Sequence, residues 1–100
     1  MRILFDHNTP APLRRALSGH EVLTAWECGW AELTNGQLLA AAESAGFALM
    51  ITTDKSIRYQ QNLSGRSIAL LVLSTNDWAA IRQASDEILA SVDTMGAGAS

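Results

Sequence analysis

Two aspartates have the residue type and the spacing to form a reactive site. Asp6 follows the apolar run at residues 2–5, and Asp54 follows a second apolar run at residues 47–52. Short apolar runs of this kind are typical of buried strands. In open parallel sheets the functional site lies outside the carboxyl ends of the strands, where the strand order reverses. We therefore expect the two side chains at one edge of a sheet.

The chemistry of such a pair depends on what neutralises it. Two carboxylates brought close without a cation repel each other, whereas Mg²⁺ or Mn²⁺ makes the pair favourable. A metal site at Asp6 and Asp54 is therefore one interpretation. The other is that both are strand-terminal residues whose side chains cap nearby backbone N–H groups. The spacing of the two residues does not decide between these interpretations.

Basic residues close to the second aspartate extend the candidate site. Lys55 and Arg58 are three residues apart, so on a helical turn they lie on one face at the rim of the cleft. With Arg66 nearby, they could hold a phosphate group. The alternative is that these residues form ordinary surface ion pairs, which specify little. Arg14 and Arg15 are open to the same two interpretations.

The elements that position these residues alternate between strand and helix. The patterns predict strands at residues 2–5, 20–25, 47–52 and 68–73. They predict helices from Pro10 to about Gly19, from a capping box at Thr34 and Gln37 to Gly46, and over 77–92. Strands alternating with helices imply βαβ units, so we expect an α/β fold with a mostly parallel sheet.

Length and composition limit the remaining possibilities. One hundred residues are enough for one domain, which we place at residues 1–93, followed by a flexible tail at 94–100. The net charge of −3 argues against a generic polyanion-binding surface, so any contact with nucleic acid must be local. The lone Cys28 cannot close an intrachain disulfide. We expect no membrane span and no signal peptide, and therefore a cytoplasmic location.

Four blocks of the sequence carry a resemblance to a known family. Residues 1–10 (MRILFDHNTP) and 49–55 (LMITTDK) resemble the two acidic blocks of the small PIN-like predicted nucleases, and residues 29–39 and 68–73 extend the similarity. Those proteins are typically toxin components of bacterial toxin–antitoxin pairs. The resemblance implies a single three-layer α/β/α PIN-like domain and a carboxylate cluster that holds Mg²⁺ or Mn²⁺. It also implies RNA cleavage by metal-activated water and a cognate antitoxin as partner.

The family pattern is only partly present in this chain. Its two strand-end acids correspond to Asp6 and Asp54, but Asn35 stands where an aspartate commonly opens the middle helix. Ser56 stands where a further aspartate usually follows. Asparagine and serine offer neutral oxygens to a hard cation and add no negative charge, which weakens a metal site.

The resemblance leads to a provisional assignment of site residues. Glu27 or Glu32 is a candidate third carboxylate, because both precede the middle helix; either could equally be a solvated loop charge. The predicted metal ligands are therefore Asp6, Asp54, Asn35, Glu27 and Glu32. The predicted RNA or phosphate ligands are Lys55, Arg58, Asn8 and Arg66.

One histidine and three tryptophans each have a functional and an ordinary interpretation. His7 could act as a general base or contact the scissile phosphate, or it is an ordinary loop residue. The default role of Trp26, Trp30 and Trp78 is core or interface area. If Trp26 and Trp30 are exposed together, we expect them to form a dimer or antitoxin contact.

Two functions from different classes follow from these residues. The first is a PIN-like toxin-type endoribonuclease that uses Mg²⁺ or Mn²⁺ to hydrolyse RNA phosphodiesters, with Asp6 and Asp54 as its catalytic residues. The second is a non-catalytic PIN-like binding module with an incomplete metal cluster, which acts through an antitoxin or RNA. A homodimer is compatible with either. A weaker third possibility is an unrelated phosphoryl-transfer fold with the same α/β layout.

Overall fold

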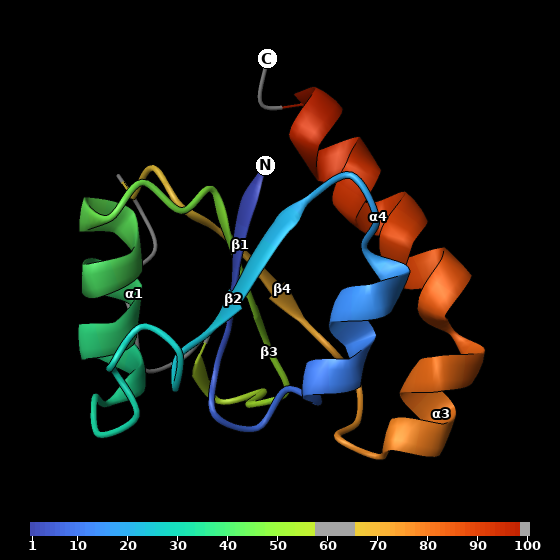
Figure 1. Ribbon diagram of the computed structural model, residues 1–100, viewed down its shortest axis with the longest axis horizontal. Coiled ribbons are helices and arrows are strands. Elements are labelled where there is room, and N and C mark those ends of the chain that lie inside the picture. The colour runs from blue at the N-terminus through green and yellow to red at the C-terminus, as the bar shows by residue number, and fades with distance from the viewer. Residues whose placement is uncertain (58–65, 99–100) are drawn as a thin grey trace.

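The fold is an α/β fold built on a parallel sheet, as the alternating pattern predicts. The structure, a computed structural model, describes residues 1–57 and 66–98. Its four strands are all parallel and lie in the order β2-β1-β3-β4. They are β1 (Arg2–Phe5), β2 (Glu21–Thr24), β3 (Leu49–Thr52) and β4 (Ala69–Val72). Figure 1 labels all four. Each lies within a predicted range, and β2, β3 and β4 are shorter than predicted.

The strand order creates a switch point at the centre of the sheet. From β1 the chain moves to β2 on one side, and it then crosses to β3 on the other side of β1. The registers Phe5↔Thr24 and Phe5↔Ile51 bring the carboxyl ends of β2, β1 and β3 to one edge. Because crevices form where the strand order reverses, residues that follow β1 and β3 lie at the position expected for a site.

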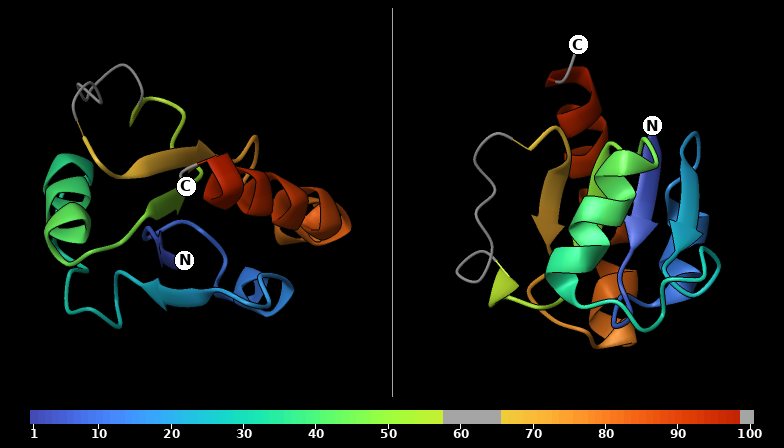
Figure 2. Two further views of the ribbon diagram at one scale, coloured as in Figure 1. Left: turned by 90° about the horizontal axis from the view of Figure 1, so that it is seen from above. Right: turned by 90° about the vertical axis from the view of Figure 1, so that its left-hand side faces the viewer.

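Helices lie on both faces of this sheet. Figure 2 shows α1 (Asn35–Ser44) on one face and η1 (Ala11–Ala16), α3 (Trp78–Gln83) and α4 (Ser85–Gly98) on the other. The strands are buried from both sides, since Leu4 and Met50 pack toward α1 while Ile3 and Ile51 pack toward the opposite helices. This alternation follows from the two-residue period of a strand, and it explains why β1 and β3 are continuously apolar.

Three details of the helices differ from the sequence expectation. The segment after Pro10 forms a 3-10 helix, and the predicted helix over 77–92 is divided into α3 and α4 at Ala84. Residues 94–98, expected as a flexible tail, continue α4 as helix. Within the described residues, no helix is both long and apolar enough to cross a membrane.

Candidate functional site

Asp6 is a buried carboxylate that accepts hydrogen bonds on both oxygens. It is 3% exposed, and its backbone N–H donates to the Ile51 carbonyl oxygen at 3.1 Å, which holds it beside β3. Oδ1 accepts from the Thr9 hydroxyl at 2.6 Å, from Thr9 N at 3.1 Å and from Asn8 N at 3.2 Å. Oδ2 accepts from the Thr52 hydroxyl. The donors are concentrated on Oδ1, which accepts three of the four hydrogen bonds.

Asp54 is held by side chains from two different segments. Its Oδ1 accepts from the Ser56 hydroxyl at 2.6 Å and from Ser56 N at 3.0 Å, and its Oδ2 accepts from Asn35 Nδ2 at 2.6 Å. The Ser56 hydroxyl, the Ser56 backbone N–H and the Asn35 amide together hold the pKa of Asp54 below its usual range. The carboxylate is therefore stabilised as an anion by uncharged donors.

The capping box places Asn35 for this contact. Thr34 Oγ1 accepts from Gln37 N at 3.3 Å, and Gln37 Oε1 accepts from Thr34 N at 3.0 Å, which confirms the predicted start of the helix. Asn35 is therefore the first residue of α1, and its side chain extends to Asp54 at the end of β3. The amide nitrogen faces the carboxylate, because an oxygen in that place would meet another acceptor.

Thr52 joins the two aspartates into one network. Its hydroxyl donates to Asp6 and accepts from Asp54 N at 3.0 Å. We refer to the connected side chains as the carboxylate network: Asp6, Thr9, Asn35, Thr52, Asp54 and Ser56. The sequence predicts that the two aspartates lie at one edge of the sheet, but no site role was predicted for Thr9 or Thr52. The sequence feature that could have indicated these roles is a threonine close to each aspartate, Thr9 after Asp6 and Thr52 before Asp54.

The carboxylate network offers few free ligand positions to Mg²⁺ or Mn²⁺ in this arrangement. Such cations need several oxygen ligands with free lone pairs, and their affinity rises with the number of anionic ligands. Here Oδ1 of Asp6 accepts three donors and Oδ1 of Asp54 accepts two, while Oδ2 of each residue accepts one, so each carboxylate keeps one oxygen with room for a further partner. Residues 1–57 and 66–98 contain no group of three or more His, Cys, Asp or Glu side chains placed to hold a metal.

The two glutamates considered as a third carboxylate do not join the network. Both carboxylate oxygens of Glu27 pair with the Arg14 guanidinium, and its Oε1 also accepts from Thr24 N at 2.9 Å. The Arg14 contact is the main reason why the pKa of Glu27 is lowered. Glu32 is exposed and makes no hydrogen bond or ion pair with the described residues. The expectation of a third carboxylate is therefore not met in this arrangement.

The predicted phosphate ligands are dispersed. Lys55 is exposed beside Asp54, and Asn8 contributes its backbone N–H to Asp6 while its own side chain faces outward. Arg66 pairs with Glu43 at 3.4 Å, so its charge is already compensated. Arg58 lies outside the described residues. The structure therefore brings Lys55 and Asn8 to the sheet edge and directs Arg66 to an acid on α1.

His7 and Trp26 line a hollow together with Asp6. The hollow measures about 460 Å³ and is lined by His7, Thr24 and Trp26, among others. His7 Nε2 lies 3.1 Å from the Leu33 carbonyl oxygen, so it makes a structural hydrogen bond across the loop. Trp26 is 80% exposed, whereas Trp30 is half-buried and meets the Phe47 ring edge-on at 6.0 Å. The two tryptophans are therefore not exposed together.

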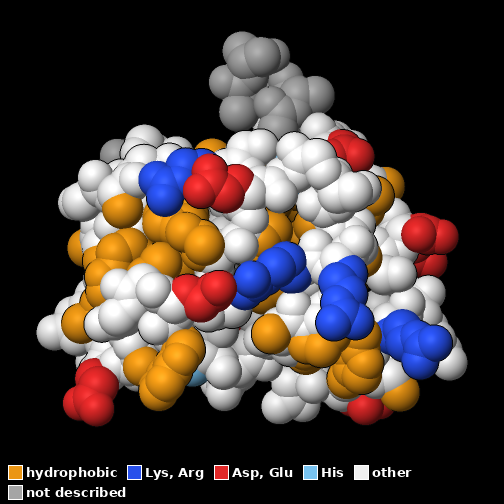
Figure 3. Space-filling view, in the orientation of Figure 1, with side chains coloured by type: hydrophobic (Ala, Val, Ile, Leu, Met, Phe, Trp, Pro, Cys, Tyr) orange, Lys and Arg blue, Asp and Glu red, His pale blue; other side chains and the backbone are white. Residues whose placement is uncertain are grey.

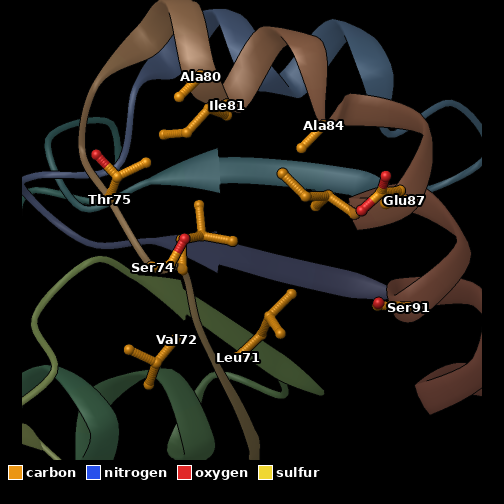
Figure 4. A pocket seen from close by; sticks show the side chains of 11 residues that line it. Leu71, Val72, Ser74, Thr75, Ala80, Ile81, Ala84, Glu87 and Ser91 are labelled. Carbon is orange, nitrogen blue, oxygen red and sulfur yellow. The ribbon is translucent and has the colours of Figure 1, made fainter.

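A second hollow lies between β4 and the helices α3 and α4, and its lining is mainly apolar. It measures about 370 Å³ and lies between β4 and the α3–α4 turn. Figure 4 shows Leu71, Ile81 and Ala84 facing into it, with Glu87 at its margin. Glu87 is its one ionisable lining residue among those described. This hollow therefore lacks the groups needed for acid–base or metal chemistry.

Comparison with known proteins gives no family assignment. No family model, curated protein or solved structure matches the chain.

Proposed function

We propose that this protein is a PIN-like module of the toxin–antitoxin kind that acts by binding and does not cleave RNA. The observation that carries the proposal is that both oxygens of Asp6 and of Asp54 accept hydrogen bonds from donors of the same chain. The positions that depart from the family pattern, Asn35 and Ser56, both donate to Asp54. At these two positions, hydrogen bonds within the chain therefore take the place of the negative charges that would hold a cation.

The fold is compatible with this assignment. Two acids at the switch point of a parallel sheet, with helices on both faces, support a three-layer PIN-like α/β/α arrangement. In this proposal the protein works in the bacterial cytoplasm, and its partners are a small antitoxin or RNA. The network contributes to the fold at the place where an active PIN-like nuclease would hold its metal.

Trp26 supports a protein partner. An indole that is 80% exposed beside a hollow of about 460 Å³ leaves a large apolar surface in water. Tryptophan is enriched among the residues that dominate binding energy at protein interfaces. In the binding-module proposal, Trp26 is the residue at which an antitoxin would make contact.

A metal-dependent endoribonuclease is the second candidate function. It is favoured by the meeting of Asp6, Asp54 and Asn35 at one sheet edge, because these are positions at which the nuclease pattern has its acids, although Asn35 is not one. It demands that a cation be held with only two carboxylates, because Asn35 and Ser56 add no negative charge and already donate to Asp54. That demand makes it the weaker candidate.

Cleavage of a fluorescent single-stranded RNA by purified, antitoxin-free protein separates the two functions. The matched control is Asp54→Asn, and folding of both proteins is checked by circular dichroism. With Mn²⁺ present, we expect no cleavage above the level seen with EDTA in either protein. Mn²⁺-dependent cleavage by the wild type that disappears in Asp54→Asn would overturn the proposal and establish the nuclease.

A further inference from the structure

A second region of the molecule concentrates positive charge away from the carboxylate network. Between η1 and α3 lies a groove of about 530 Å³, which we call the arginine groove. It is lined by Pro12, Arg15, Ala16, Trp78, Arg82 and Ser85. Figure 3 shows blue basic side chains gathered over η1 and α3 on this face. The groove shares no residue with the carboxylate network.

The two groove arginines differ from other arginines of the chain in having no acidic partner among the described residues. Arg2, Arg14 and Arg66 pair with glutamates. Arg15 and Arg82 are exposed and form no ion pair with an acid in residues 1–57 or 66–98. In a chain of net charge −3, this leaves a local positive region while the rest of the surface disfavours polyanions.

Trp78 adds an aromatic surface between these charges. It is half-buried, packs against the core cluster that contains Leu13 and Ile81, and lines the groove. Because Leu13 belongs to η1 and Ile81 to α3, the same core fixes the two elements that carry the arginines. The backbone segments that carry the ring and the two arginines are therefore fixed by one core.

This combination indicates the chemistry of a ligand. A guanidinium group presents a planar fork of donors that matches a phosphate, and an aromatic ring provides a stacking surface for a base. A ligand that offers both features within a short distance is a phosphodiester strand with unpaired bases. We propose that the arginine groove binds single-stranded nucleic acid, with Arg15 and Arg82 on the phosphates and a base against Trp78. This rests on the proposed function, in which the protein acts by binding.

An acidic peptide is the competing ligand, because arginine and tryptophan also dominate protein interfaces. An acidic peptide uses the two charges through its carboxylates, but those side chains carry no ring that could stack on Trp78. The groove volume, about 530 Å³, lies in the range of sites that enclose a small ligand group. The presence of the ring beside both charges therefore favours the nucleic acid.

The test is fluorescence anisotropy with a labelled single-stranded RNA oligomer, measured in EDTA so that no metal chemistry intervenes. We expect Arg15→Gln/Arg82→Gln to weaken the affinity roughly tenfold or more. The slope of log affinity against log salt should fall by about 1.4, since each phosphate contact to a single strand contributes about 0.7. Both positions are exposed, so the variant should remain folded.

Arg14→Gln is the matched control, because Arg14 lies next to Arg15 on η1 but is paired with Glu27. It should change the affinity by less than about threefold. A DNA oligomer of the same sequence should also bind through the groove, because the recognised phosphates and bases are common to both. An abasic oligomer of equal charge should bind more weakly than RNA, since it cannot stack.

Two results would overturn the inference. One is an unchanged affinity in Arg15→Gln/Arg82→Gln; the other is binding of a labelled polyglutamate peptide as tight as that of RNA, which would assign the groove to an acidic protein. Either result would leave the non-catalytic assignment intact, because that assignment depends on cleavage in Mn²⁺. Conversely, Mn²⁺-dependent cleavage would overturn the non-catalytic assignment, but it would not bear on whether the groove binds nucleic acid.

Discussion

The carboxylate network and the arginine groove each bring together two charges of the same sign, but only the network supplies partners for them within the fold. In the network, two anions from β1 and β3 meet hydroxyl, amide and backbone donors of the same chain. In the groove, two cations from η1 and α3 meet no acid among the described residues. Charges that the fold satisfies internally stabilise the fold, whereas charges that it leaves in water are available to a ligand.

Burial explains why the two regions differ. Asp6 is 3% exposed, and a carboxylate withdrawn from water to that degree is tolerated only with strong hydrogen bonds. Arg15 and Arg82 remain exposed, so water solvates them and no internal partner is needed. The comparison therefore predicts that substitutions in the network change stability, while substitutions in the groove change binding.

The largest expected effect is on the free energy of unfolding of Asp6→Ala. Removal of the carboxylate leaves the buried Thr52 hydroxyl and the Thr9 backbone N–H without this acceptor, while the Thr9 hydroxyl keeps the Ile51 carbonyl oxygen at 2.9 Å. Loss of hydrogen bonds to a buried charged group should lower the free energy of unfolding by about 3 kcal/mol. Urea unfolding measures the change.

The control for that measurement is Arg15→Gln in the arginine groove. An exposed arginine without an acidic partner should change the free energy of unfolding by less than about 0.5 kcal/mol. If Asp6→Ala and Arg15→Gln lowered the free energy of unfolding equally, the comparison would fail, because the groove arginine would then stabilise the fold as much as the buried aspartate does.

A smaller effect is expected from the pH dependence of Asp54→Asn. The pKa of Asp54 is lowered in the folded state from 3.8, chiefly by the Ser56 hydroxyl, so ionised Asp54 stabilises the fold above that value. As the pH falls through the folded-state pKa, the carboxylate is protonated and this stabilisation is lost. The wild type should therefore be more stable than Asp54→Asn at neutral pH, by about 1 kcal/mol, and the difference should shrink in acid.

Urea unfolding of both proteins at about pH 7 and about pH 3 measures this difference. The pKa values of Glu27 and Glu43 are also lowered, but both residues are present in both proteins, so their contributions cancel. A stability difference that is the same at both pH values would show that the hydrogen bonds to Asp54 do not depend on its charge.

The strands, the helix start and the meeting of the two aspartates could be predicted from the sequence. The apolar pattern of a strand and the capping box at Thr34 depend only on residues that are close in the sequence. Asp6 and Asp54 come together because the carboxyl ends of neighbouring parallel strands lie at the same edge of the sheet. These features require no knowledge of how side chains point across the fold.

The donors to Asp54 and the arginine groove could not be predicted in the same way. Asn35 and Asp54 are nineteen residues apart, and their contact depends on how α1 packs against the sheet. Likewise, Arg15 and Arg82 come together only because η1 and α3 pack on one core. Periodicity assigns a residue to an element, but it does not give the direction of a polar side chain toward another element.

The central claim is that hydrogen bonds, and not a cation, satisfy the two aspartates. Isothermal titration calorimetry of Mn²⁺ into the wild type and Asp54→Asn tests it most directly, without dependence on any RNA substrate. We predict no saturable Mn²⁺ binding by either protein. Saturable binding by the wild type that is lost in Asp54→Asn would contradict the account, because Asp54 would then have exchanged the donors of Asn35 and Ser56 for a metal ion.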